Sequence, residues 1–133
     1  MPSRFDVVII GAGPAGIACA QALAGSSLRV LMLEKSETIG PKVCAGGLTR
    51  RATRFGVPGD RARSFREQVI RIDDGPPFRI ALTHPMMTVS RTDLARHQLA
   101  GLERAPNVEI AAGTRVTGLS DGTVTTTRGA FSF

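Results

Sequence analysis

FDVVIIGAGPAGIACAQALAGSSLRVLMLE, at residues 5–34, sets the architecture that we expect for the whole chain. An apolar strand at 5–10 leads into a glycine turn, a helix at 14–25 and a second apolar strand at 29–33 that an acid follows. Continuous apolar strands are typical of a parallel sheet covered on both faces. Two such strands joined by a helix make a right-handed crossover. The stretch therefore predicts a βαβ unit.

The glycine turn carries the spacing of a dinucleotide-binding fingerprint. Gly11 allows a tight turn out of the strand, Gly13 lets the backbone approach a pyrophosphate, and Gly16 lets the helix pack closely on the sheet. The helix N-terminus would point free N–H groups at the phosphates. Glu34 follows the turn by about 20 residues, where an acid can accept a hydrogen bond from a ribose hydroxyl. The same acid disfavours NADP, because it repels a 2′-phosphate.

Two simpler interpretations of these residues stay open. A βαβ unit can bind nothing, although the strand, helix and acid in the required order make this the weaker interpretation. Glu34 could also be a solvated acid or a helix cap rather than a ribose ligand.

The remaining sequence predicts an α/β, Rossmann-like FAD/NAD(P)-binding fold with a parallel sheet and an antiparallel β insertion. Strands are expected at 68–73 and 78–82 around Asp74-Gly75, with a third at 86–89, so that residues 66–90 form the insertion. Residues 36–47 read as a long functional loop. Helices are expected at 49–55 and 91–104, a third parallel strand at 108–111, a hairpin around Asp121-Gly122, and the start of a further strand at 130–133.

Composition excludes several classes of protein. The 133 residues suffice for one modest domain, here 1–133, and no apolar run is long enough to span a bilayer. The net charge is +6, but no aromatic residues interleave with the basic ones as in single-strand nucleic-acid binders, so we expect no nucleic-acid partner. Cys19 and Cys44 do not suggest a disulfide framework. His84 and His97 lack further ligands at metal spacing, so no metal site is expected.

Four motifs resemble the FAD-dependent oxidoreductases of the p-hydroxybenzoate hydroxylase superfamily, and most closely its geranylgeranyl reductase group. They are GAGPAG at 11–16, LEK at 33–35, KVCAGGL at 42–48 and VSRTDLARHQL at 89–99. The first is shared by many flavin and nicotinamide enzymes, whereas KVCAGGL is much more selective. The resemblance covers only the N-terminal part of such an enzyme, so we expect the FAD-binding domain to be incomplete at its C-terminal end.

The resemblance implies a set of FAD contacts in this sequence. Residues 13–16 would hold the pyrophosphate, Glu34 the adenosine ribose, residues 44–47 the flavin ring and its ribityl side, and Val116 the adenine through its backbone. Arg91 would reach the phosphates or ribityl hydroxyls, a geometry that a guanidinium suits. We expect contact rather than thiol catalysis from Cys44. The expected cofactor-binding residues are Gly11, Gly13, Pro14, Ala15, Gly16, Glu34, Lys35, Lys42, Cys44, Ala45, Gly46, Gly47, Arg91 and Val116; no catalytic residue is assigned.

By the same resemblance, a complete relative would reduce isoprenoid double bonds or hydroxylate an organic substrate, with FAD taking electrons from NAD(P)H or another donor. The isolated chain should turn over poorly. The alternative is a non-catalytic adenine-dinucleotide-binding module that pairs with a partner chain through an exposed sheet edge. A cytoplasmic location is expected, and peripheral attachment to a membrane is left open.

Overall fold

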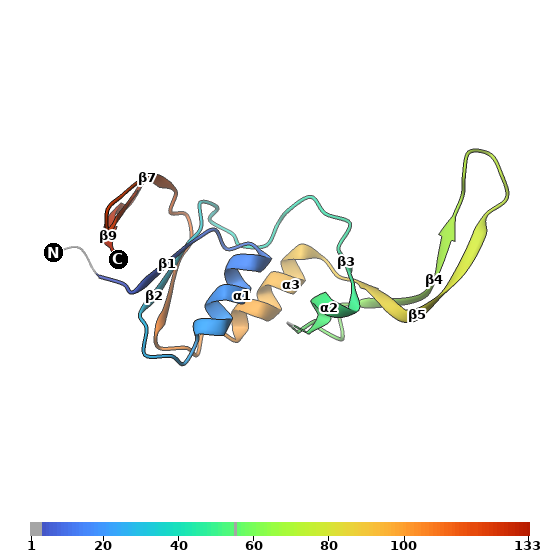
Figure 1. Cartoon of the computed structure of the whole chain (residues 1–133), viewed down its shortest axis with the longest axis horizontal. Helices are drawn as coiled ribbons and strands as arrows, with labels where there is room; N and C mark the ends of the chain where they lie inside the picture. The colour runs from blue at the N-terminus through green and yellow to red at the C-terminus, as the bar shows by residue number, and fades with distance from the viewer. Residues whose placement is uncertain (1–3, 55) are drawn as a thin grey trace.

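The computed structural model describes residues 4–54 and 56–133 (Figure 1). Among these residues, strands β1 (Val7–Ile10), β2 (Val30–Leu33) and β6 (Val108–Ala111) form a parallel sheet in the order β1-β2-β6. The central strand β2 pairs Val30 with Val7 on one side and with Val108 on the other. All four residues of β2 are buried, which explains why its sequence is a continuous apolar run.

Helices α1 (Pro14–Leu23) and α3 (Arg91–Ala100) pack against each other on one face of this sheet (Figure 1). Met32 of β2 points to this face, where it belongs to an apolar cluster with Ala12, Ile17, Ala20, Ala95 and Leu102. The small side chains of α1 let the helix approach the sheet closely. This layer places the N-terminal end of α1 beside the end of β2, where the N–H of Ala12 donates to Glu34.

A second, antiparallel sheet covers the opposite face. Strands β7 (Val116–Ser120), β8 (Thr123–Thr126) and β9 (Gly129–Ser132) are arranged in chain order. Leu31 and Leu33 alternate with Met32, so they point away from the helices and pack with Phe5 and Val124. The ring of Phe131 meets that of Phe5 edge-on, with 6.1 Å between centroids.

A long hairpin projects from this body (Figure 1) and is called the β4–β5 arm, residues 63–88. It consists of β4 (Arg63–Ile70) and β5 (Phe78–Thr88); β3 (Gly47–Leu48) pairs with the base of β5, and the short helix α2 (Arg50–Thr53) lies beside it. In the outer part of the arm, Ile70 pairs with Phe78 and Gln68 with Ile80. Side chains of paired residues lie on the same face of a ladder, so Ile70, Phe78 and Ile80 make this face largely apolar, and all three are exposed.

The structure confirms the predicted βαβ unit, the third parallel strand at β6 and the hairpin around Asp121-Gly122. The predicted third strand of the insertion is wrong, because residues 86–88 continue β5 and β3 supplies the third strand. The expected final strand is present as β9, which pairs with β8.

Several other element boundaries also differ from the prediction, and helix α1 ends at Leu23 instead of 25. Helix α3 ends at Ala100 instead of 104, since Gly101 follows and the next residues form turns. Helix α2 is shorter than the predicted 49–55, and Phe55 lies outside the described residues. Strand β4 begins at Arg63, five residues before the expected start, and ends at Ile70.

Candidate functional site

The glycine turn between β1 and α1 has the backbone that its sequence predicts. Gly11 adopts a φ of 101°, in the region that favours glycine, and its N–H donates to the main-chain oxygen of Leu33 at 2.7 Å. A Cβ at Gly16 would collide with the main-chain oxygen of Gly11, so only glycine permits this close packing of helix on strand. A Cβ at Gly13 would meet no atom of the described residues within 4 Å. The protein's own packing therefore leaves the space in front of Gly13 open.

Glu34, which directly follows β2, is bonded to this turn. Its Oε2 accepts from the N–H of Ala12 at 2.9 Å, and its Oε1 accepts from the N–H of Ser36 at 2.9 Å. Partial burial alone would raise the pKa of Glu34, but the hydrogen bonds from Ser36 and Ala12, with the nearby charge of Lys35, outweigh it and hold the pKa below its ordinary value. The carboxylate is thus ionised at neutral pH and fixed beside the N-terminus of α1.

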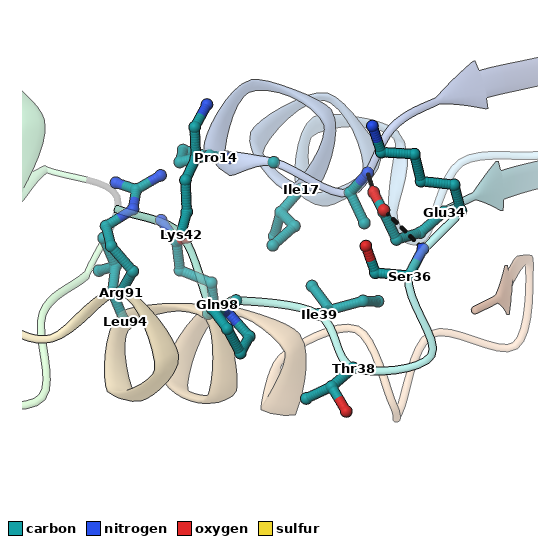
Figure 2. Close-up of a pocket in the computed structure, with 16 residues that line it drawn as sticks. Pro14, Ile17, Glu34, Ser36, Thr38, Ile39, Lys42, Arg91, Leu94 and Gln98 are labelled. Carbon is teal, nitrogen blue, oxygen red and sulfur yellow. Dashed lines mark hydrogen bonds between the residues drawn. The ribbon is translucent and has the colours of Figure 1, made fainter. Parts of the chain in front are cut away.

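A cavity of about 370 Å³ lies between the N-terminal end of α1, the loop after β2 and helix α3. Figure 2 shows Glu34 at one end of it, and Lys42 and Arg91 at the other end near Pro14. The cavity therefore has a fixed anion at one end and two cations at the other. Its lining residues are Ala12, Gly13, Pro14, Ile17, Glu34, Lys35, Ser36, Thr38, Ile39, Gly40, Pro41, Lys42, Arg91, Leu94, Ala95 and Gln98.

A second cavity, of about 280 Å³, opens on the other side of Glu34 and Lys35, which border both. It lies at the ends of β1 and β2, beside the start of β7, where Val116 stands. The lining residues are Ile10, Gly11, Leu33, Glu34, Lys35, Thr114, Arg115 and Val116. The two cavities together make an elongated site around one carboxylate, an arrangement that suits a ligand with several linked parts.

The structure brings eight of the predicted cofactor-binding residues to these two cavities: Gly11, Gly13, Pro14, Glu34, Lys35, Lys42, Arg91 and Val116. Ala15 and Gly16 follow in the first turn of α1. Residues 44–47 line neither cavity. Gly46 packs against Val89, whose N–H donates to the Gly46 oxygen at 3.1 Å, and a Cβ at Gly46 would collide with the Val89 oxygen.

Two residues that the sequence analysis did not single out contribute to the site. Ser36 donates its N–H to Glu34, and Gln98 lines the larger cavity from α3. Helical periodicity could have predicted that Gln98 lies near Arg91, because positions 91, 94, 95 and 98 share one face of a helix. Loop contacts such as that of Ser36 have no comparable signal.

Within residues 4–54 and 56–133, no cluster of three or more His, Cys, Asp or Glu side chains could hold a metal ion. The ring of His84 instead lies 3.0 Å from the guanidinium of Arg50. In the same part of the chain, no helix combines the length and the apolar character needed to cross a membrane.

Comparison with known proteins places this geometry in a family. A digeranylgeranylglycerophospholipid reductase of Methanopyrus kandleri is 44% identical over 73 residues, which are 54% of this chain and 16% of that protein. Another, of Methanocella arvoryzae, is 29% identical over 126 residues, which are 90% of this chain and 32% of that protein. The chain thus spans less than a third of the length of these relatives.

The fold has close counterparts among solved structures. PqsL, a probable FAD-dependent monooxygenase from Pseudomonas aeruginosa, superposes with a TM-score of 0.80 at 18% identity, over 98% of this chain and 40% of PqsL. Residues 6–129 match the family described as FAD dependent oxidoreductase. The chain therefore belongs to the family of FAD-dependent oxidoreductases.

Proposed function

We propose that this chain forms the part of an FAD-dependent oxidoreductase that holds the adenosine and pyrophosphate of FAD. The observation that carries the proposal is the meeting of Gly13 and Glu34 in one cavity: open space in front of a bare backbone, next to a fixed carboxylate. A pyrophosphate can approach the backbone at Gly13 without a clash, and a ribose hydroxyl can donate to the carboxylate of Glu34.

The residues that line the two cavities suit the pyrophosphate and the adenine of FAD. The N-terminal end of α1 would receive the pyrophosphate, and Lys42 and Arg91 at the same end of the larger cavity would offset its negative charge. The smaller cavity, with Val116, would take the adenine. When bound, FAD supplies the electron transfer; the protein supplies binding, orientation and electrostatics.

Residues 44–47 are proposed to contact the flavin ring, on the strength of the KVCAGGL motif. The exposed thiol of Cys44 accepts a hydrogen bond from the N–H of Gly46 at 3.4 Å, so this loop has a local turn of its own beyond the larger cavity. A role for Cys44 in positioning the ring is proposed, and none in catalysis.

The substrate class of the whole protein is proposed from its relatives. Two of them are named as reductases of an isoprenoid phospholipid, which favours reduction of isoprenoid double bonds over hydroxylation. Such a reduction consumes two electrons and two protons per double bond, and NAD(P)H is the proposed electron donor. A lipid substrate would suit a cytoplasmic protein that attaches to the membrane surface.

The FAD site is tested by titrating the purified protein with FAD and following the quenching of flavin fluorescence. We expect saturable binding at one FAD per chain. Gly13→Ala should weaken it by about 5–150-fold, because a methyl group in the approach path costs about 1–3 kcal/mol. Gly59→Ala is the matched control, since its Cβ would also meet no described atom within 4 Å, in a connector far from the cavity in sequence.

The absence of saturable FAD binding by the wild-type protein would contradict the proposal. Equal affinities of the Gly13→Ala and wild-type proteins would instead place FAD elsewhere. Thermal unfolding of both glycine variants verifies that each remains folded.

A second candidate function is a nucleotide-binding module that pairs with another polypeptide. The observation that favours it is an edge strand that is open to pairing. Among the described residues, β1 pairs with β2 on one side only, and Ile10 of β1 is 56% exposed. The apolar face of the β4–β5 arm, with Phe78 and Ile80, is exposed as well. Edge strands and exposed apolar faces are surfaces on which chains associate.

A further inference from the structure

The loop between β2 and β3 rests on helix α3 at Gly40. This glycine adopts a φ of 119°, in the left-handed region that favours glycine. A Cβ at Gly40 would lie 3.0 Å from the Cβ of Ala95 and 3.1 Å from the Cα of Thr92, both in α3. The backbone of the loop therefore lies directly on the first two turns of the helix, and a larger residue would force one of them to shift.

A second glycine fixes the other end of the same segment. Gly46 is buried, has a φ of 74°, and accepts at its main-chain oxygen from the N–H of Val89 at 3.1 Å. Val89 stands two residues before the start of α3. Gly40 and Gly46 thus attach both ends of the segment to the same neighbourhood of the fold.

The residues between these two glycines have little contact with the rest of the protein, and we call residues 41–45 the strap. All five are exposed, and Val43 is apolar and yet has a relative exposure of 102%. Within the described part of the chain, no backbone hydrogen bond holds the strap. Segments with few buried contacts and solvated backbone groups belong to the least stable parts of a fold.

One side chain of the strap reaches the site. Lys42 lines the larger cavity, and Figure 2 shows its side chain extending from the loop toward Pro14 in the first turn of α1. Its ammonium forms no ion pair with the described carboxylates. Because the N-terminal end of α1 also attracts anions, phosphate groups there would draw Lys42, and the strap with it, toward the helix.

We propose that the strap closes over the pyrophosphate of the cofactor, with Lys42 binding the phosphates and with Gly40 and Gly46 as its fixed ends. This inference rests on the proposed function, because it assumes that the N-terminal end of α1 holds the pyrophosphate. Closure carries Val43 and Cys44 from solvent toward the ligand, so apolar area that the free protein exposes becomes covered. The two glycines are positioning residues, since they act through the strap.

The two cysteines of the chain allow closure to be measured. Cys44 lies in the strap, Cys19 lies on α1, and both are exposed. Alkylation by N-ethylmaleimide, followed by mass spectrometry, gives the rate at Cys44 with Cys19 as the internal reference. Saturating ADP, which has the pyrophosphate and no flavin, should slow the reaction of Cys44 about tenfold, a typical coupling between a ligand and a second site. FAD should slow it at least as much, and adenosine, which has no phosphate, should leave it unchanged.

Two variants test the named residues, each at a saturating concentration of ADP. Lys42→Met keeps an unbranched side chain without the charge and should abolish the protection of Cys44 by ADP; Arg51→Met, the same charge change at an exposed residue of α2, is its control. Gly40→Ala should weaken the protection, because its Cβ displaces one end of the strap, and Gly59→Ala is its control. Thermal unfolding verifies folding, and Lys42→Met decides alone if Gly40→Ala does not fold.

Protection of Cys44 by FAD alone would overturn the inference, because the flavin would then cover the thiol directly. Protection by no ligand, protection by adenosine, or full protection by ADP in Lys42→Met would overturn it too, since phosphates would not drive closure. Full protection in Gly40→Ala would overturn the role of that glycine. In each case FAD fluorescence titration still detects binding to the wild type, so the proposed function stands; failure of that titration would overturn the proposed function and this inference together.

Discussion

Glu34 shows at the scale of a single residue how the backbone prepares a ligand group. The N–H groups of Ala12 and Ser36 hold its carboxylate in place and keep the pKa below its ordinary value of 4.5. A carboxylate that is already oriented and ionised loses little freedom when a ribose hydroxyl donates to it. The bond from Ala12 also connects the end of β2 to the glycine turn, so the residue contributes to stability as well.

Glu34→Gln should lower both the melting temperature and the affinity for FAD, the latter about tenfold, because an amide is a weaker acceptor than a carboxylate. The control is Glu37→Gln, which makes the same charge change at an exposed acid that pairs with Arg128 at 3.3 Å. Equal losses in the two variants would show that only net charge matters.

The lowered pKa of Glu34 also predicts a pH dependence. A depressed folded-state pKa contributes stability that is present above the unfolded value, near 4.5, and is lost as the pH falls through the folded-state pKa. The difference in melting temperature between wild type and Glu34→Gln should therefore be constant from neutral pH to about 5 and shrink below 4.5. A difference that grew on acidification would contradict this assignment.

At the scale of elements, one side chain connects the C-terminal end of α1 to the start of β6. The amide of Asn107 donates to the main-chain oxygens of Leu23 at 3.0 Å and Leu28 at 2.9 Å, and its oxygen accepts from the N–H of Gly25 at 2.9 Å. It satisfies carbonyl groups that a helix end leaves without partners. The crossover between β1 and β2 is thereby fixed to the third strand.

Asn107→Ala should destabilise the fold by about 1–3 kcal/mol, because it removes three hydrogen bonds to backbone groups, of which the one to Leu23 is partly buried. Urea unfolding measures the change, and Gln68→Ala on the exposed β4–β5 arm is the control, expected within about 0.5 kcal/mol of wild type. The affinity of the folded variant for FAD should not change, since Asn107 lies at the opposite end of α1 from the glycine turn. A selective loss of FAD affinity would contradict this separation.

At the scale of the whole molecule, the structure consists of a packed body and the projecting β4–β5 arm. The body buries β2 on both faces, whereas the described residues of β4 are all exposed. On the arm, Glu67 and Arg79 form an ion pair, and Ile70, Phe78 and Ile80 share the other face by register. The face with Ile70, Phe78 and Ile80 is thus largely apolar and exposed, which is the pattern of a surface that another element or chain covers.

Replacing both Phe78 and Ile80 by threonine should reduce concentration-dependent self-association, measured by sedimentation velocity. Threonine keeps a preference for strands while removing apolar area, so the melting temperature should change little. FAD affinity should also be unchanged. Val69→Thr is the control on the opposite face of the same ladder, where it also removes exposed apolar area. A wild-type protein that stays monomeric at all concentrations would argue against pairing through this surface.

The sequence alone determined the βαβ unit and its glycine turn, because both depend on local properties: apolar periodicity, the left-handed φ of Gly11 and the close contact at Gly16. For the same reason Glu34, at the end of a recognisable strand, could be predicted beside the N-terminus of α1. The resemblance to flavin enzymes added Lys42, Arg91 and Val116, three positions that no local rule would have connected.

Only the tertiary structure decided which distant residues meet. Packing of α3 against α1 placed Gln98 in the same cavity as Gly13, although 85 residues separate them in the chain. Packing against Val89 gave Gly46 a structural role, and pairing with β4 and β3 made residues 86–88 part of β5. Such contacts arise from the order in which elements stack, and that order depends on the whole core rather than on any single stretch of sequence.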